Sequence, residues 1–154
     1  WVNHISTIFT EVRLKTFIEM RGADAGGYKS LCALPALWTG ILYCCDSLDE
    51  AFKITSSIKF EDLLNFRKEV CKVGLNAELN GYKGWQLAKE VLKISKNGLK
   101  QRGKINSFGD DENIHLSFLE ELISHKKSNA ASMIDKYYKN EKINIELLFS
   151  EQSF

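Results

Sequence analysis

The hydrophobic pattern of this chain changes once, at the glycine-rich segment of residues 22–27. Before that segment, residues 5–15 and 17–21 are rich in Ile, Thr, Phe and Val and alternate polar with apolar side chains, which predicts strands. After it, apolar residues recur at helical spacing. Helices are therefore expected over residues 28–45, 47–56, 60–73, 85–102, 113–126 and 129–140, with a last short turn over 145–149. This order of elements predicts an α+β fold.

Several helix ends carry their own signals. Ser47, with Glu50 three residues later, predicts an N-cap with a capping box. Ser128 predicts a further N-cap before the last long helix. Gly74 and Gly103 stand where helix C-termini are expected, since glycine readily takes the left-handed conformation there.

Composition is that of one folded unit. The chain has 154 residues, of which 44% are hydrophobic, enough for a single sizeable core. Because 21 Lys and Arg stand against 20 Asp and Glu, the net charge is +1, and we expect no nucleic-acid partner. The longest apolar run, residues 31–45, contains Pro35 and is shorter than the roughly 20 residues that span a membrane, so we expect no membrane partner either.

Two further features bear on origin and compartment. The four cysteines form no C-x-x-C pair and no signal peptide is evident, which favours reduced thiols in the cytoplasm and leaves a plastid location open. The chain begins at Trp1 rather than at Met, so we expect a piece of a longer polypeptide.

Glu19 and Arg21 form the most informative pattern before the glycines. Side chains two residues apart on a strand share one face and lie about 7 Å apart, so these two point to the same side. Ile18 and Met20 then point to the other side, which we expect to be the core. Only Thr16 separates this run from the preceding one, so a hairpin and one long bent strand both stay open.

The chemistry of these side chains suits a charged ligand. A carboxylate offers the hard oxygen that Mg²⁺ prefers, and a guanidinium binds phosphoryl oxygens in pairs. Glu19 and Arg21 would suit a site where a metal ion and a phosphate lie side by side, and Arg13 and Lys15 could add positive charge for a substrate carboxylate. Spacing alone favours a simpler interpretation, a solvent-exposed face with cross-strand ion pairs.

A family resemblance changes that balance. Residues 6–24, STIFTEVRLKTFIEMRGAD, resemble the signature of glutamate–cysteine ligases of the plant and proteobacterial type, and residues 31–43, LCALPALWTGILY, are similar to its continuation. The chain departs from the family pattern at Thr10 and Gly27, where Pro is usual, and at Tyr28, where Trp is usual. A looser likeness in register covers the rest of the chain, as the C-terminal portion of a longer ligase domain.

The resemblance implies both a fold and a reaction. The strands would belong to an antiparallel sheet of the glutamine synthetase type, with residues 1–27 as active-site strands and bend, and residues 28–154 as a helical scaffold. The reaction would be the ATP-dependent ligation of the γ-carboxylate of glutamate to the amine of cysteine through γ-glutamyl phosphate, the first step of glutathione biosynthesis. ATP and Mg²⁺ would be the cofactors.

The resemblance also assigns roles to individual residues. Glu19 would be a Mg²⁺ ligand, and Arg21 would be the catalytic residue that contacts the transferred phosphate. Arg13, Phe9 and Tyr28 would contact the substrate. One carboxylate cannot fill an octahedral Mg²⁺ shell, so the other ligands are expected upstream in the same polypeptide, and the isolated piece should be inactive and poorly stable.

Two other interpretations stay open. The protein could be another carboxylate–amine ligase of the same superfamily with a different amine acceptor. It could also be a non-catalytic helical interaction module that keeps vestiges of a site. Intact Glu19, Arg21 and Asp24 argue against the module, because drift would erase that polar face first.

Overall fold

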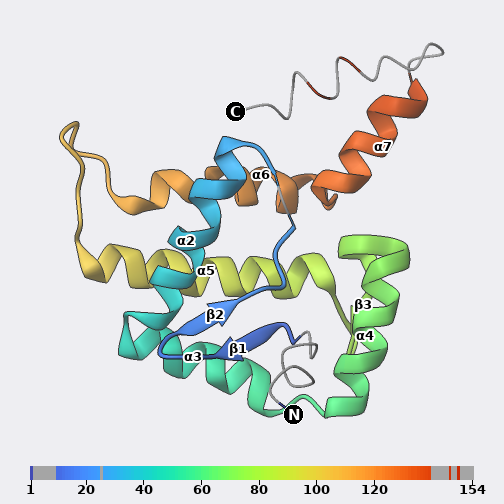
Figure 1. Ribbon diagram of the computed structural model, residues 1–154, viewed down its shortest axis with the longest axis horizontal. Helices are drawn as coiled ribbons and strands as arrows, with labels where there is room; N and C mark the ends of the chain where they lie inside the picture. The colour runs from blue at the N-terminus through green and yellow to red at the C-terminus, as the bar shows by residue number, and fades with distance from the viewer. Residues whose placement is uncertain (2–9, 25, 140–145, 147–148, 150–154) are drawn as a thin grey trace.

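The computed structural model describes residues 1, 10–24, 26–139, 146 and 149 of the chain. Its elements follow in this order: β1 (Val12–Leu14), β2 (Ile18–Met20), α2 (Tyr28–Leu42), α3 (Cys45–Ser56), α4 (Phe60–Val73), η1 (Gly74–Asn76), β3 (Glu78–Leu79), β4 (Tyr82–Lys83), α5 (Gly84–Arg102), η2 (Glu112–Leu116), α6 (Ser117–His125) and α7 (Asn129–Lys139). Short antiparallel strands precede a mainly helical remainder, which confirms the predicted α+β class (Figure 1).

The first two strands form a hairpin. Their antiparallel register pairs these residues directly: Val12 with Met20, Arg13 with Glu19, and Leu14 with Ile18. The backbone N–H of Lys15 donates to the carbonyl of Phe17 at 2.9 Å, which closes the turn. The question left open by Thr16 is thereby settled in favour of a hairpin. That the hairpin belongs to a larger sheet of the glutamine synthetase type stays a prediction.

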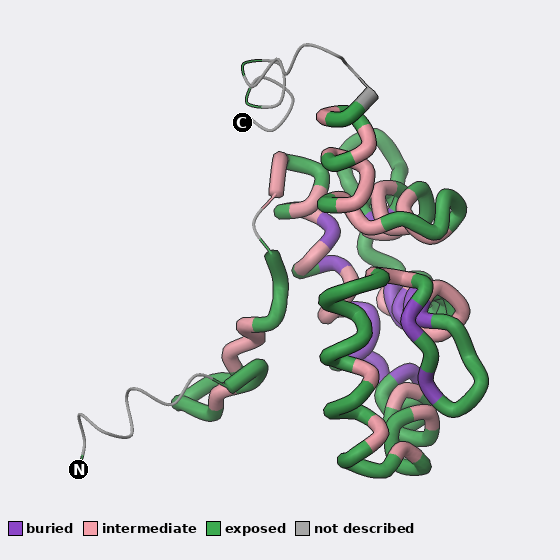
Figure 2. Tube along the Cα trace, turned by 90° about the vertical axis from the view of Figure 1, so that its right-hand side faces the viewer, coloured by how far each residue is buried: buried purple, intermediate pink, exposed green. Residues whose placement is uncertain are grey.

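Helix α5 is the centre of the helical part, with α2, α3, η2 and α6 packed around it. In Figure 2 the buried residues gather along α2 and α5. Four side chains form a buried apolar cluster, and three half-buried ones pack against it: Ala36, Leu92, Leu99 and Leu116, with Leu37, Leu119 and Ile123. Burying these groups removes apolar area from water, which is the main favourable term holding the helices together.

Helices α2 and α5 cross at unusually close range, and small residues make this possible. A Cβ added at Gly98 would lie 1.8 Å from the carbonyl oxygen of Gly40, and one added at Gly40 would lie 2.3 Å from the carbonyl oxygen of Ser95. Two buried hydroxyls bind neighbouring helices to α5: Ser95 Oγ donates to the Leu37 carbonyl of α2 at 2.9 Å, and Ser47 Oγ of α3 donates to the Ile94 carbonyl of α5 at 3.0 Å.

The role of Ser47 differs from the sequence prediction. Helix α3 begins at Cys45 without a side-chain cap, so the predicted Ser47–Glu50 capping box is wrong. Ser47 is instead a buried residue in the first turn, and its hydroxyl is used by the contact with α5. The other end signals are confirmed: Gly74 and Gly103 follow α4 and α5, and Ser128 Oγ accepts from the backbone N–H of Ala131 at 3.2 Å.

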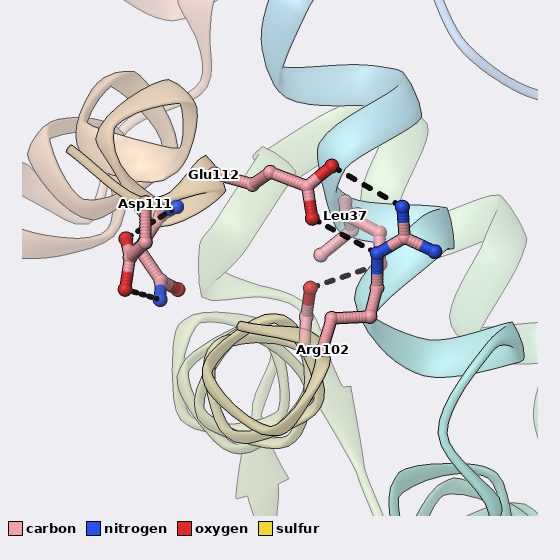
Figure 3. A network of polar contacts seen from close by, with 6 residues as sticks. Leu37, Arg102, Asp111 and Glu112 are labelled. Carbon is pink, nitrogen blue, oxygen red and sulfur yellow. Dashed lines mark hydrogen bonds and ion pairs between the residues drawn. The ribbon is translucent and has the colours of Figure 1, made fainter. Parts of the chain in front are cut away.

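A polar network fixes the end of α5 to η2 (Figure 3). The Glu112 carboxylate accepts from Arg102 Nε at 2.9 Å and from Arg102 Nη2 at 3.5 Å. Asp111 caps η2, since its side chain accepts from the backbone N–H of Asn113 at 2.9 Å. These contacts close the connection of residues 103–111 and serve the fold. Because η2 takes the first positions of the expected helix, residues 113–126 are a 3₁₀ turn followed by α6 rather than one helix.

The hairpin β1–β2 stands to one side of the helical part in Figure 2. Its apolar side is open to solvent: Leu14 is 81% exposed and Ile18 57% exposed. The prediction that Ile18 points to a core is therefore wrong for the described residues, while Met20 is half-buried. One ion pair ties the hairpin to the helices, from Arg67 Nη2 on α4 to Glu11 Oε1 at 2.6 Å.

No single helix in the described part of the chain is long and apolar enough to cross a membrane. Helices α2 and α3 reach the required length and composition only when taken together, and they meet at a bend of 93°.

Candidate functional site

The β1–β2 register brings four charged side chains together, and we call Arg13, Lys15, Glu19 and Arg21 the charged face. Glu19 is at its centre, directly opposite Arg13. Arg13 Nε donates to Glu19 Oε2 at 2.8 Å. Arg21 Nε lies 3.8 Å from the same oxygen, and Lys15 Nζ lies 3.8 Å from Oε1. The prediction that Glu19 and Arg21 point to the same side of their strand is confirmed.

The charged face is half-buried and carries a net positive charge. The side chains of Arg13, Glu19 and Arg21 are 34%, 30% and 25% exposed. The hydrogen bond from Arg13 holds the pKa of Glu19 below the usual carboxyl range; partial burial opposes this effect, and the nearby cations reinforce it. Three cations around one carboxylate favour an anionic ligand over a bare cation.

The lowered pKa of Glu19 predicts how the charged face responds to acid. In the unfolded chain Glu19 has an ordinary pKa, so its ion pairs add stability above that pKa, and this contribution is lost as the pH falls through the lowered value. A ¹³C NMR titration of the side-chain carboxyls should place the Glu19 midpoint below the usual range, and Arg13→Gln should raise it. An ordinary midpoint in the unmodified protein would contradict the observed geometry.

The other two predicted substrate residues, Tyr28 and Phe9, do not belong to the charged face. Tyr28 opens α2 after the glycine-rich bend and is 71% exposed. Its neighbour is Cys32, one turn along the same helix, and that thiol raises the pKa of the Tyr28 hydroxyl. Phe9 lies outside the described residues. Asp24, which follows the charged face, is exposed.

Sequence reasoning missed the contribution of α4. Arg67 forms an ion pair with the Glu11 carboxylate. The backbone carbonyl of Glu11 also accepts a hydrogen bond from the backbone N–H of Arg21 at 2.8 Å. A Cβ at Gly22 would lie 2.8 Å from Glu11 Oε2, so glycine leaves room for this carboxylate. No local sequence pattern around residue 67 predicts the ion pair with Glu11, because the two residues lie far apart in the sequence.

The metal-binding capacity of the charged face is limited. Within the described residues, no group of three or more His, Cys, Asp and Glu side chains is placed to hold a metal ion. Glu19 offers one hard carboxylate, and the cations around it suit phosphate oxygens. This donor set fits a Mg²⁺ ion whose other ligands come largely from a polyphosphate, and it does not fit a bare ion.

The hollows of the helical part are not lined by the residues of the charged face. One of about 610 Å³ is bounded by α3, the β3–β4 hairpin and the start of α5, with Ile54, Leu79 and Trp85 among its lining. None of the predicted site residues lines it, and its walls are mainly apolar, with Lys89 and Glu90 as the charged residues of the lining. The charged face therefore remains the candidate site.

Comparison with a family model and with curated proteins leads to the same kind of enzyme each time. The family model described as Glutamate-cysteine ligase family 2 (GCS2) matches residues 1–150. Glutamate–cysteine ligase A, chloroplastic, of Oryza sativa subsp. indica is 47% identical over 103 residues, which are 67% of this chain and 21% of that protein. Glutamate–cysteine ligase, chloroplastic, of Medicago truncatula is 36% identical over 152 residues, 98% of this chain and 28% of that protein. The enzyme of that name from Arabidopsis thaliana is 44% identical over 103 residues, 67% of this chain and 20% of that protein.

The chain thus spans between a fifth and 28% of the length of these curated relatives. The family match includes the charged face and nearly all of the helical part. The resemblance first noted in residues 6–24 and 31–43 is confirmed by it. This chain belongs to glutamate-cysteine ligase family 2.

Proposed function

We propose that this chain supplies one side of the active site of an ATP-dependent ligase that joins the γ-carboxylate of glutamate to the amine of cysteine. The observation that carries the proposal is the convergence of Arg13, Lys15 and Arg21 on Glu19, inside the segment that the family model matches. The names of the relatives support the same reaction, which opens glutathione biosynthesis. Because those relatives are several times longer, the chain is proposed to act within a longer polypeptide.

The chemistry of the reaction explains why such a face is useful. A carboxylate is a poor electrophile at neutral pH, so the glutamate γ-carboxylate must first receive a phosphoryl group from ATP, and the cysteine amine then displaces phosphate. Phosphoryl transfer is catalysed mainly by positioning and by neutralising charge. Arg21 is proposed to hold the oxygens of the transferred phosphate, and Glu19 to be one oxygen ligand of the Mg²⁺ that accompanies ATP.

The remaining predicted residues are proposed to bind substrate. Arg13 presents a planar guanidinium suited to a carboxylate of the amino acid. Tyr28 and Phe9 are proposed to contact the substrate as well; Tyr28 is exposed at the start of α2 and stands at the end of the bend that follows Arg21. Since the chain contributes one carboxylate, the Mg²⁺ ligands that the phosphates do not supply are assigned to the rest of the polypeptide.

The compartment is proposed from the relatives. Each of those compared above is named as a chloroplastic enzyme, which favours the plastid over the cytoplasm that the cysteine pattern suggested.

The reaction can be tested on the complete polypeptide that contains this chain. Purified protein is incubated with glutamate, ATP and Mg²⁺, and with cysteine, serine, glycine or no added amine. Product is identified by mass spectrometry, and phosphate release is measured in parallel. We expect γ-glutamylcysteine and an equal amount of phosphate, both dependent on cysteine. Faster turnover with another amine would point to a different ligase of the superfamily, and absence of product with every amine would favour the non-catalytic module.

A further inference from the structure

The Glu19 carboxylate is already engaged in the folded chain. Arg13 Nε donates to Oε2 at 2.8 Å, and Arg21 Nε lies 3.8 Å from the same oxygen. The other oxygen, Oε1, faces Lys15 Nζ at 3.8 Å. A metal ion that binds Oε2 must therefore displace the hydrogen-bonded guanidinium, and one that binds Oε1 alone must share the carboxylate with it. In either position three cations repel the metal.

We propose that Arg13 is an exchangeable counter-ion: it pairs with Glu19 when the charged face is empty, and it turns to the substrate carboxylate when a metal–nucleotide complex occupies Glu19. This inference rests on the proposed function. It gives Arg13 two partners one after the other, first Glu19 and then the substrate carboxylate. Arg13 is thus a positioning residue for Glu19 first and a substrate contact afterwards.

The charges dictate the order of binding. A free divalent cation approaches a face of net positive charge and is disfavoured, whereas a Mg²⁺–nucleotide complex carries net negative charge and is attracted by the same three cations. The phosphates also supply most of the oxygen ligands that Mg²⁺ requires. The metal is therefore expected to enter with the nucleotide and not before it.

The geometry of Arg13 allows the exchange. Its Nε is the atom bonded to Glu19, and the side chain is 34% exposed, so it can turn without leaving a buried charge unpaired. The guanidinium presents five donors in a fork that fits a carboxylate. Direct cross-strand placement keeps Arg13 beside Glu19 in either state.

Exchange of one cation between two anions couples their binding. If the metal–nucleotide complex releases Arg13, it must strengthen glutamate binding, and glutamate must strengthen nucleotide binding by the same factor. Couplings of this kind are typically about 5- to 150-fold in affinity. The lower end is expected here, because the pair is partly exposed to water.

The test measures Mn²⁺ binding to the complete polypeptide by electron paramagnetic resonance, with and without a non-hydrolysable ATP analogue, and glutamate binding by calorimetry. For the unmodified protein we expect weak binding of Mn²⁺ alone, tight binding with the analogue, and tighter glutamate binding when both are present. Arg13→Gln should bind Mn²⁺ alone about 3- to 10-fold more tightly, because a competing cation is gone. It should also lose the coupling to glutamate. A gain in affinity is the opposite of what loss of a folded site would produce.

Two controls separate the possible failures. Arg67→Gln removes an arginine that pairs with Glu11 outside the charged face, and it should leave Mn²⁺ affinity within about twofold of the unmodified value. Unchanged or weaker binding of Mn²⁺ alone to Arg13→Gln would overturn the exchange while leaving the ligase proposal in place. If Glu19→Gln binds Mn²⁺ and the analogue as well as the unmodified protein does, the metal role proposed for Glu19 is itself wrong.

Discussion

Replacing Gly98 by alanine is expected to lower the free energy of unfolding by about 3 kcal/mol, at the upper end of the cost of overpacking. The added Cβ would lie 1.8 Å from the Gly40 carbonyl oxygen and 2.8 Å from Ser47 Oγ. Backbone cannot rotate away as a side chain can, so α2 and α5 must separate, and both interhelical serine hydrogen bonds would weaken. Urea unfolding followed by circular dichroism measures the change.

The sign of this effect discriminates between two physical contributions. Intrinsic propensity alone would make alanine more stable than glycine inside a helix by about 1 kcal/mol. Asn97→Ala is the matched control, because Asn97 is the exposed neighbour of Gly98 in α5 and its replacement adds no contact with α2. We expect that variant to unfold within about 0.5 kcal/mol of the unmodified protein. Equal or greater stability of Gly98→Ala would mean that the two helices do not cross as closely as described.

Glu19→Gln is expected to reduce ligase turnover by about 100-fold or more in the complete polypeptide, the range found when a preorganised electrostatic group is removed. The amide keeps the size of the side chain and loses the charge that both the metal and the cations require. Because the ion pairs of Glu19 are partly exposed to water, their loss should lower the melting temperature only slightly. Steady-state rates of γ-glutamylcysteine formation, measured together with thermal unfolding, check both statements; normal turnover would contradict the proposed role.

The class of fold was predictable because its signals are local. Period-two alternation before residue 22 and helical periodicity after residue 27 depend on neighbouring residues only, and the observed strands and helices follow them. The bounds of α4 agree with the prediction, and those of α7 agree to within one residue. Gly74 and Gly103 mark helix ends for the same local reason.

The β3–β4 hairpin was missed although its signal is present. Asn80 and Gly81 form the turn with φ of 51° and 84°, which is the combination that Asn-Gly favours between two strands. The strands themselves, Glu78–Leu79 and Tyr82–Lys83, are too short to show alternation. Helix packing overrode a second local signal, since Ser47 bonds to Ile94 on α5 and does not cap α3.

The candidate site was predictable in part. Alternation places Glu19 and Arg21 on one side of a strand, and this needs no knowledge of the partner. The direct pairing of Arg13 with Glu19 needs the register of the hairpin, which a one-residue shift would change. The ion pair of Arg67 with Glu11 depends on how α4 packs, which no local pattern encodes.

The most direct test of the charged face compares two identical substitutions in the complete polypeptide, Arg21→Lys and Arg67→Lys. Lysine keeps the charge but not the planar fork that holds two phosphate oxygens. If the charged face is half of a ligase site, Arg21→Lys should form γ-glutamylcysteine at about 1% of the unmodified rate or less. Arg67→Lys should turn over normally, and both variants should melt at nearly the same temperature as the unmodified protein. Equal turnover of the two variants would contradict the assignment of Arg21 and with it the catalytic role of the hairpin.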